Sequence, residues 1–239
     1  RLPLVQPALR RARAIKVHVL VEGPSEAAFV EAWAPRLLRG HELKAYPHQG
    51  KGRLPGPGET VAPSRRGLLD QLPSKLRAFG KEFDSDTDRV LVLVDADNES
   101  CVDLKKRMLE LLAQIERPPK VLFRIAIEEL EAFYLGDLAA LRNAYPNHDA
   151  KKARSYVPDS ICSTAELFGE VIDDGGLNKV AWAETMGPKL TVQPKRSRSP
   201  SFKKLVSGLR ELVSVAPQAK QKAKRRHAAK PKKGKRPGK

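Results

Sequence analysis

Four acidic residues stand where two largely apolar stretches of the sequence end. Glu22 follows the run "VHVLV" and precedes Glu26 by one helical turn, while Asp95 and Asp97 follow the run "VLVLV". Carboxylates that are brought close together repel one another unless a cation neutralises them. Oxygen ligands of this kind suit Mg²⁺ or Mn²⁺, whose coordination is completed by water and substrate phosphate. The spacing therefore predicts a divalent-metal site, provided that both runs end at the same place in the fold.

The elements that must position these acids alternate between predicted strands and predicted helices. Strands are expected over 16–22, 42–48, 89–95 and 119–127. Helices are expected over 24–39, 65–82 with a kink or break at Pro73, 101–116, 128–144, 164–172, 179–188 and 201–214. Such alternation requires crossover connections and predicts an α/β fold, with a parallel sheet of about four strands and helices on both faces. Ligand sites in such sheets form at the carboxyl ends of the strands, where these acids fall.

Each acidic pair also has a simpler interpretation when it is taken alone. Glu22 can be an acid that the helix dipole favours at a helix N-terminus. Asp95 and Asp97 can form a turn and an N-cap before the helix expected at 101. The occurrence of both pairs at the ends of two buried strands favours the metal site.

The positive charge is concentrated at the two ends of the chain. Residues 217–239 contain eleven Lys or Arg and no acid, residues 1–16 contain five and no acid, and residues 17–188 have a net charge of −5. The tail has few apolar residues, so we expect it to be disordered in isolation. It suits contact with nucleic acid through counterion release, and a solubilising or localisation tail is the alternative. Four parts are expected: a basic extension (1–14), a core (15–135), a helical part (136–215) and the tail (216–239).

Several other classes of protein are disfavoured. No run of 18 apolar residues exists, so no membrane span is expected, and no secretory signal is recognisable. Cys101 and Cys162 lack the spacing of a metal site and indicate a reducing, cytoplasmic compartment. His18 lies on a buried strand and is interpreted as a core histidine with satisfied hydrogen bonds. No GxSxG motif or Walker motif is present.

The order of these motifs resembles a known domain. "VEGPSE", followed some seventy residues later by "VLVDAD", resembles the TOPRIM domain of topoisomerases, bacterial primases, small RNA-maturing nucleases and the overcoming-lysogenization-defect nucleases. "IAIEELEAFYLGD" also resembles a segment of small TOPRIM proteins from bacterial defence loci, although Glu128 stands where those proteins have His. The resemblance covers residues 15–135 well and 136–215 loosely. It implies a Rossmann-like TOPRIM core.

The resemblance also implies roles for individual residues. Glu22, Asp95 and Asp97 match the acids of the family signature, and Glu26 matches the second Glu of its nuclease-like variant. Glu129 and Glu131 match a further acidic pair that completes a two-metal site.

Glu129 and Glu131 have an alternative interpretation. The segment can form an amphipathic helix with Leu130, Phe133 and Tyr134 directed inward and both acids solvated.

Two lysines are candidates to stabilise charge on a phosphate. A Lys before a late helix has this role in the nuclease branch, and Lys179 is the nearest match, with Lys51 in the "GKG" loop as the second choice. The implied activity is divalent-metal-dependent cleavage of nucleic acid, with DNA favoured over RNA, as the effector of an anti-phage defence system. A regulatory or nucleic-acid-binding module that depends on a partner, such as an ATPase, is the alternative.

The charge distribution generates a prediction about the tail. Deleting residues 217–239 removes eleven cations but none of the candidate site residues. We expect weaker binding to nucleic acid and a flatter dependence of affinity on salt, because fewer counterions are released. Turnover at saturating substrate should change little. Binding measured across a salt series with and without the tail tests this, and an unchanged slope would mean that the tail does not contact phosphates.

Overall fold

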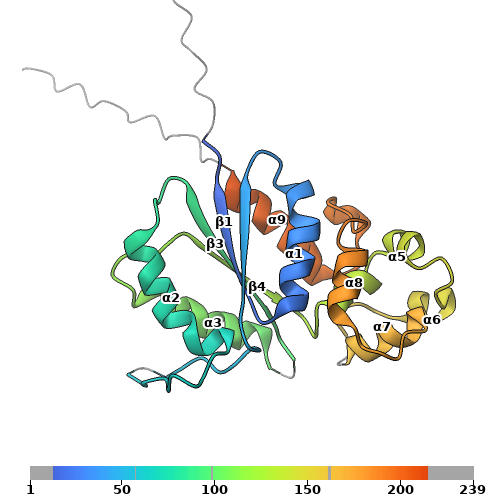
Figure 1. Ribbon diagram of the computed structural model, residues 1–239, viewed down its shortest axis with the longest axis horizontal. Helices are drawn as coiled ribbons and strands as arrows, with labels where there is room; N and C mark the ends of the chain where they lie inside the picture. The colour runs from blue at the N-terminus through green and yellow to red at the C-terminus, as the bar shows by residue number, and fades with distance from the viewer. Residues whose placement is uncertain (1–12, 57, 98, 161–162, 215–239) are drawn as a thin grey trace, which may run out of the picture.

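The computed structural model describes residues 13–56, 58–97, 99–160 and 163–214. Its sheet contains four parallel strands in the order β2-β1-β3-β4 (Figure 1). The strands are β1 (Lys16–Val21), β2 (Glu42–Pro47), β3 (Asp88–Asp95) and β4 (Val121–Ala126). The predicted α/β class, with a four-stranded parallel sheet flanked by helices and a helical C-terminal part, is therefore confirmed. The tail and most of the basic extension lie outside the described residues.

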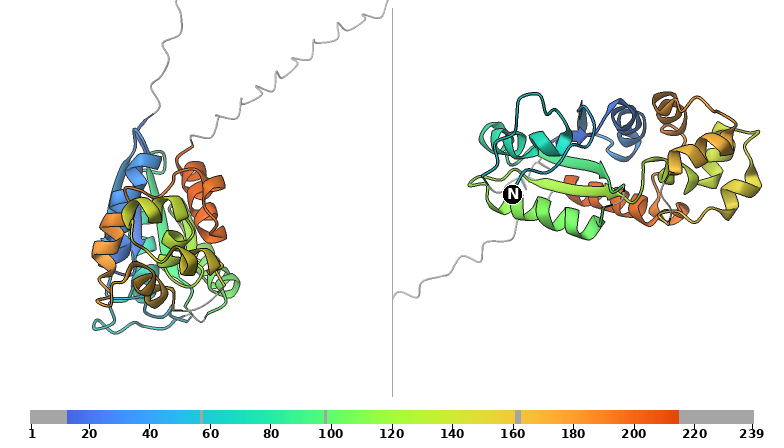
Figure 2. Two further views of the ribbon diagram at one scale, coloured as in Figure 1. Left: turned by 90° about the vertical axis from the view of Figure 1, so that its right-hand side faces the viewer. Right: turned by 90° about the horizontal axis from the view of Figure 1, so that it is seen from below.

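Helices cover both faces of the sheet. The helices are α1 (Pro24–Leu37), α2 (Leu68–Glu82), α3 (Cys101–Ala113), α4 (Glu131–Leu135), α5 (Leu138–Ala144), α6 (Ala150–Ser155), α7 (Thr164–Ile172), α8 (Lys179–Met186) and α9 (Pro200–Val213). α1 and α9 share one apolar core with side chains of β1 and β3, and α2 and α3 share a second core on the opposite face (Figures 1 and 2). No helix among the described residues is long and apolar enough to cross a membrane.

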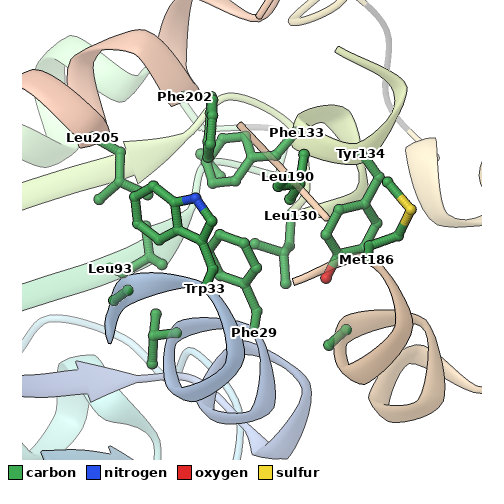
Figure 3. Packing of buried hydrophobic residues seen from close by; sticks show 14 of the residues in the cluster. Phe29, Trp33, Leu93, Leu130, Phe133, Tyr134, Met186, Leu190, Phe202 and Leu205 are labelled. Atoms are coloured by element: carbon green, nitrogen blue, oxygen red, sulfur yellow. The ribbon is translucent and has the colours of Figure 1, made fainter. Parts of the chain in front are cut away.

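The C-terminal helices pack beside α1 (Figure 1). Trp33 of α1 is fully buried, and its ring lies 5.4 Å from that of Phe29 and 5.2 Å from that of Phe202 in α9 (Figure 3). Its indole N–H donates to the Thr191 carbonyl at 3.1 Å. Because α1 contacts α8 and Trp33 packs on Phe202 of α9, the late part of the chain is fixed against the first crossover helix.

The strands and most helices fall within a few residues of their predicted bounds, and the differences concern the segment 128–144 and Pro73. The single helix expected over 128–144 is two helices, α4 and α5, separated by Gly136 and Asp137. Of the kink or break expected at Pro73, the break is absent, since α2 is continuous. Pro73 is the sixth residue of α2, so the helix continues although the missing N–H removes one of its hydrogen bonds.

His18 is a core histidine, as predicted. It is 4% exposed, and its ring nitrogens lie 2.9 Å from the Tyr46 hydroxyl and 2.8 Å from Asp88 Oδ1. Its ring also stacks on Phe83 at 4.1 Å. These contacts join β1 to both neighbouring strands at the end of the sheet opposite the acids.

Gly80 in α2 gives a prediction for the fold. A Cβ at this position would collide with the carbonyl oxygen of Arg117. We expect Gly80→Ala to lower the free energy of unfolding by about 1–3 kcal/mol, because the backbone cannot yield as a side chain can. Gly175→Ala is the matched control, since nothing lies within 4 Å of its Cβ position. Urea unfolding of both variants is the measurement, and equal midpoints would contradict the packing described here.

Candidate functional site

The candidate site lies at the carboxyl edge of the sheet. Glu22 follows β1 directly and Asp95 is the last residue of β3. These two strands are adjacent and parallel, so their ends meet at one edge. The backbone N–H of Asp95 donates to Glu22 Oε1 at 2.7 Å. This hydrogen bond fixes the first carboxylate against the strand that carries the second.

Two further carboxylates are buried beside this pair. Glu26, in the first turn of α1, is 8% exposed and accepts a hydrogen bond from the Ser25 hydroxyl at 2.9 Å. Glu131, at the start of α4, is 1% exposed. The alternative in which both acids of this segment are solvated is therefore wrong for Glu131. The same alternative also predicted that Leu130, Phe133 and Tyr134 are directed inward, and this is correct, because all three are buried.

The buried carboxylates repel one another strongly. Burial raises the pKa of Glu22 to about 7, and the neighbouring Glu26 adds to the rise. Burial likewise raises the pKa of Glu131 to about 7. The pKa of Asp95 lies well above its usual range because of burial, with Glu22, Glu26 and Glu131 contributing further. A group of acids that resists ionisation in this way is typical of a site that receives a cation or a proton.

Asp97 occupies the exposed side of the same edge. It accepts a hydrogen bond from Lys51 Nζ at 2.9 Å, and the same ammonium donates to the Ala96 carbonyl at 3.0 Å. The backbone of Asp97 (φ 50°) and that of Glu128 (φ 74°) both adopt the left-handed region, which costs free energy for residues other than glycine. Strained backbone therefore occurs after both β3 and β4, at two adjacent positions, since the Asp97 N–H donates to the Glu128 carbonyl at 3.4 Å.

Glu129 and Lys179 form a separate pair next to the buried acids. Lys179 Nζ donates to Glu129 Oε1 at 3.0 Å, and the Ala165 N–H donates to Glu129 Oε2 at 2.8 Å. Although burial opposes ionisation, these donors lower the pKa of Glu129 below its usual value. Burial also disfavours the Lys179 ammonium, but Glu131 and Glu129 raise its pKa overall. The structure thus turns Glu129 toward a lysine and the start of α7.

The donor chemistry of this edge fits a hard divalent cation, but the side chains do not form a finished coordination shell. Within residues 13–56, 58–97, 99–160 and 163–214, no three His, Cys, Asp or Glu side chains are grouped so that they could hold a metal ion. The reason lies in the local hydrogen bonds, which direct the oxygens of Glu22, Asp97 and Glu129 toward protein donors. Glu22 and Asp97 would therefore have to rotate before they could share one ion.

The hydroxyl of Tyr134 lies near the acids. The sequence pattern predicted only that this side chain is directed inward and gave no sign of a role in the site. The residue is fully buried, and its hydroxyl has no hydrogen-bond partner in the described part of the chain. Burial raises the pKa of Tyr134 well above its usual range, and Glu131, Glu26 and Asp95 raise it further because they lie nearby. An unpaired buried hydroxyl costs stability, so its position beside the acids suits a polar ligand that completes the site.

The unpaired hydroxyl gives a prediction for the protein in EDTA. Tyr134→Phe should leave the free energy of unfolding unchanged or raise it by up to about 1–3 kcal/mol, because no hydrogen bond is lost. Tyr156→Phe is the matched control, since that hydroxyl donates to Glu128 Oε2 at 2.9 Å, and its loss should be destabilising. Denaturant unfolding of both variants provides the comparison. Equal destabilisation would mean that the Tyr134 hydroxyl has a partner in solution.

Comparisons with known proteins identify a family for the chain. A family model described as a domain of unknown function (DUF4276) matches residues 21–210. The searches of curated proteins and of solved structures found no match. The matched range begins at the last residue of β1 and continues into α9, so it includes all of the candidate acids and both lysines. The chain belongs to the DUF4276 family.

Proposed function

We propose that this protein is a divalent-metal-dependent nuclease of the TOPRIM type, which hydrolyses phosphodiester bonds in nucleic acid. The observation that carries the proposal is the burial of Glu22, Asp95 and Glu131 at one edge of a parallel sheet. Burial raises the pKa of all three, and Glu22 and Glu131 raise that of Asp95 further. Acids that served only the fold would be solvated or fully paired with cations, because buried like charges are costly. Because the buried carboxylates lower the stability of the free protein, their presence is better explained by a ligand that binds to them.

The residues that would hold Mg²⁺ or Mn²⁺ are Glu22, Glu26, Asp95, Asp97 and Glu131. When bound, such an ion activates water and stabilises the charge that develops on the scissile phosphate. Glu129 is assigned a different task, because Lys179 and the Ala165 N–H already engage both of its oxygens. It holds the ammonium of Lys179 beside the cluster.

The two lysines supply positive charge to different members of the acidic cluster. Lys51 pairs with Asp97 on the exposed side, and Lys179 pairs with Glu129 next to Glu131. The raised pKa of Lys179 keeps its ammonium protonated near neutral pH, so it acts as a cation and not as a base. Both groups would stabilise negative charge on the phosphoryl oxygens, which makes Lys51 as strong a candidate as Lys179.

The charge of the whole chain supports nucleic acid as the substrate. The formal net charge is +17, and most of the excess lies outside the acidic core, so long-range attraction to a polyanion is strong. We place the protein in the cytoplasm as an anti-phage effector that acts on DNA in preference to RNA. The TOPRIM likeness rests on "VEGPSE", "VLVDAD" and their positions after β1 and β3.

One observation favours a second candidate, a TOPRIM protein that is inactive until a partner binds. The carboxylates are held by hydrogen bonds within the protein and are not grouped around one point in the described residues. A partner, such as an ATPase, or the substrate itself could release them. The two candidates differ in whether the isolated chain cleaves nucleic acid when a divalent ion is added.

A set of matched variants tests the proposal. Purified protein should cleave plasmid, linear DNA or structured RNA in Mg²⁺ or Mn²⁺ and not in EDTA. Asp95→Asn and Glu26→Gln should each reduce cleavage by about a hundredfold or more, because each removes a charge that holds the ion. Asp103→Asn and Glu31→Gln, which change exposed acids on α3 and α1, should cleave at the rate of the unaltered protein.

The same variants distinguish a lost site from a lost fold. Thermal unfolding in EDTA should show that Asp95→Asn is folded, since it removes one member of a repelling cluster. Added Mn²⁺ should raise the Tm of the unaltered protein but not that of Asp95→Asn. Cleavage that persists in EDTA, or full activity in Asp95→Asn, would contradict the proposal. Ion binding without cleavage would favour the partner-dependent candidate.

A further inference from the structure

The outer edge of β4 forms a second feature that the carboxylate site does not use. β4 is the last strand in the order β2-β1-β3-β4, so the described residues supply no strand on its far side. The Val90 N–H donates to the Lys120 carbonyl at 2.9 Å, and the Ala96 N–H donates to the Ala126 carbonyl at 2.8 Å. Even-numbered residues of β4 therefore bond to β3, and the backbone groups of Val121, Phe123 and Ile125 are directed outward.

A groove runs along this edge between α3 and α9. Its volume is about 820 Å³, and its floor includes Phe123, Ile125 and Ile127. Val102 and Leu109 of α3, which are 71% and 48% exposed, line one wall. These two residues are seven positions apart, so they lie on the same side of the helix. An exposed strand edge and exposed apolar side chains thus occur in one continuous groove.

The charges at the rim of the groove are predominantly positive. Lys105, Lys106, Arg124 and Lys204 line it, with Glu110 as the acidic residue among its described lining. Arg124 already donates to the Lys204 carbonyl at 2.9 Å and to the Phe123 carbonyl at 2.9 Å, so it fixes α9 to β4. Neither Lys105 nor Lys204 forms an ion pair with the part of the chain that the structure describes. Their charges are therefore available to a ligand.

We propose that this groove binds an extended, acidic segment of a partner protein, which adds to the sheet as a strand beside β4. Main-chain hydrogen bonds to the outward groups of β4, apart from the Phe123 carbonyl that Arg124 engages, would supply affinity. Alternate side chains would enter the apolar groove or reach the lysines. The proposal does not depend on the nuclease assignment, because the groove contains none of the carboxylates of the candidate site.

The charges of the groove favour an acidic segment over three alternative ligands: the chain's own terminal segments, a second copy of the chain and nucleic acid. The chain's own terminal segments, 1–16 and 217–239, are strongly basic and contain no acid, so the lysines of the groove would repel them. A second copy that paired through the same edge would bring the same lysines together. Nucleic acid fits the charge, but it gains little from the exposed Val102 and Leu109 or from the strand edge. An acidic segment with alternating apolar residues satisfies the charge, the apolar floor and the backbone groups together.

A defined peptide tests the proposal. The probe is a labelled peptide of alternating Val and Glu that matches the 6 residues of β4, and its binding to the full chain in EDTA is followed by fluorescence anisotropy. Lys105→Glu combined with Lys204→Glu should weaken binding by about tenfold or more. Lys151→Glu combined with Lys195→Glu, at exposed positions outside the groove, should leave affinity within about twofold. Amide exchange at Val121, Phe123 and Ile125 should slow when the peptide binds.

Four outcomes would overturn the inference. No binding of the Val–Glu peptide would mean that the lysines only protect the edge from aggregation. Equal binding of a Val–Lys peptide would remove the charge argument. Slowed exchange of the same amides by single-stranded DNA, with displacement of the peptide, would assign the groove to nucleic acid. A dimer of the free protein that dissociates in Leu109→Asp would assign it to a second copy. Each result is obtained without divalent ions and so leaves the proposed nuclease activity separately testable.

Discussion

The burial of several like-charged carboxylates at one edge of the sheet is the constraint to which the rest of the structure responds. Glu26 and Glu131 are almost fully inaccessible, and the Asp95 N–H holds Glu22 at 2.7 Å. Burying unpaired charge costs several kcal/mol per group, so the surrounding scaffold must be stable. Two apolar cores, one on each face of the sheet, provide that stability. Lys51 reduces the repulsion at Glu22, and Lys179 reduces it at Glu131.

The same constraint determines how pH acts on the protein without a bound cation. Burial raises the pKa of Glu22 and of Glu131 from 4.5 to about 7. The folded state therefore binds more protons than the unfolded state between these values, and stability falls as pH rises from about 4.5 to about 7. A bound divalent ion would reverse this trend, because it favours the ionised carboxylates. Near neutral pH the cluster would thus be poised between a proton and the proposed metal ion.

Local sequence was sufficient to predict the parallel sheet and the acids at its edge, because strand ends and apolar runs are short-range features. It could not predict the break between α4 and α5. Gly136 leaves room for Ser199, whose Cβ would lie 2.9 Å from a Cβ at that position. Asp137 caps α5 through the Ala140 N–H and also accepts from the Thr191 N–H at 2.9 Å. The burial of Glu131 and the unpaired Tyr134 hydroxyl likewise follow from tertiary packing, which the helical pattern of this segment does not encode.

The contact between Trp33 and Thr191 has a consequence for the order in which the chain can fold during synthesis. The two residues are separated by 158 positions, so α1 leaves the ribosome long before the segment that covers its indole exists. Until α8 and α9 are made, the apolar face of α1 with Phe29 and Trp33 remains uncovered by them. A nascent chain of this protein therefore lacks part of the cover of this aromatic face until synthesis is nearly complete, and incompletely packed apolar surface of this kind favours aggregation.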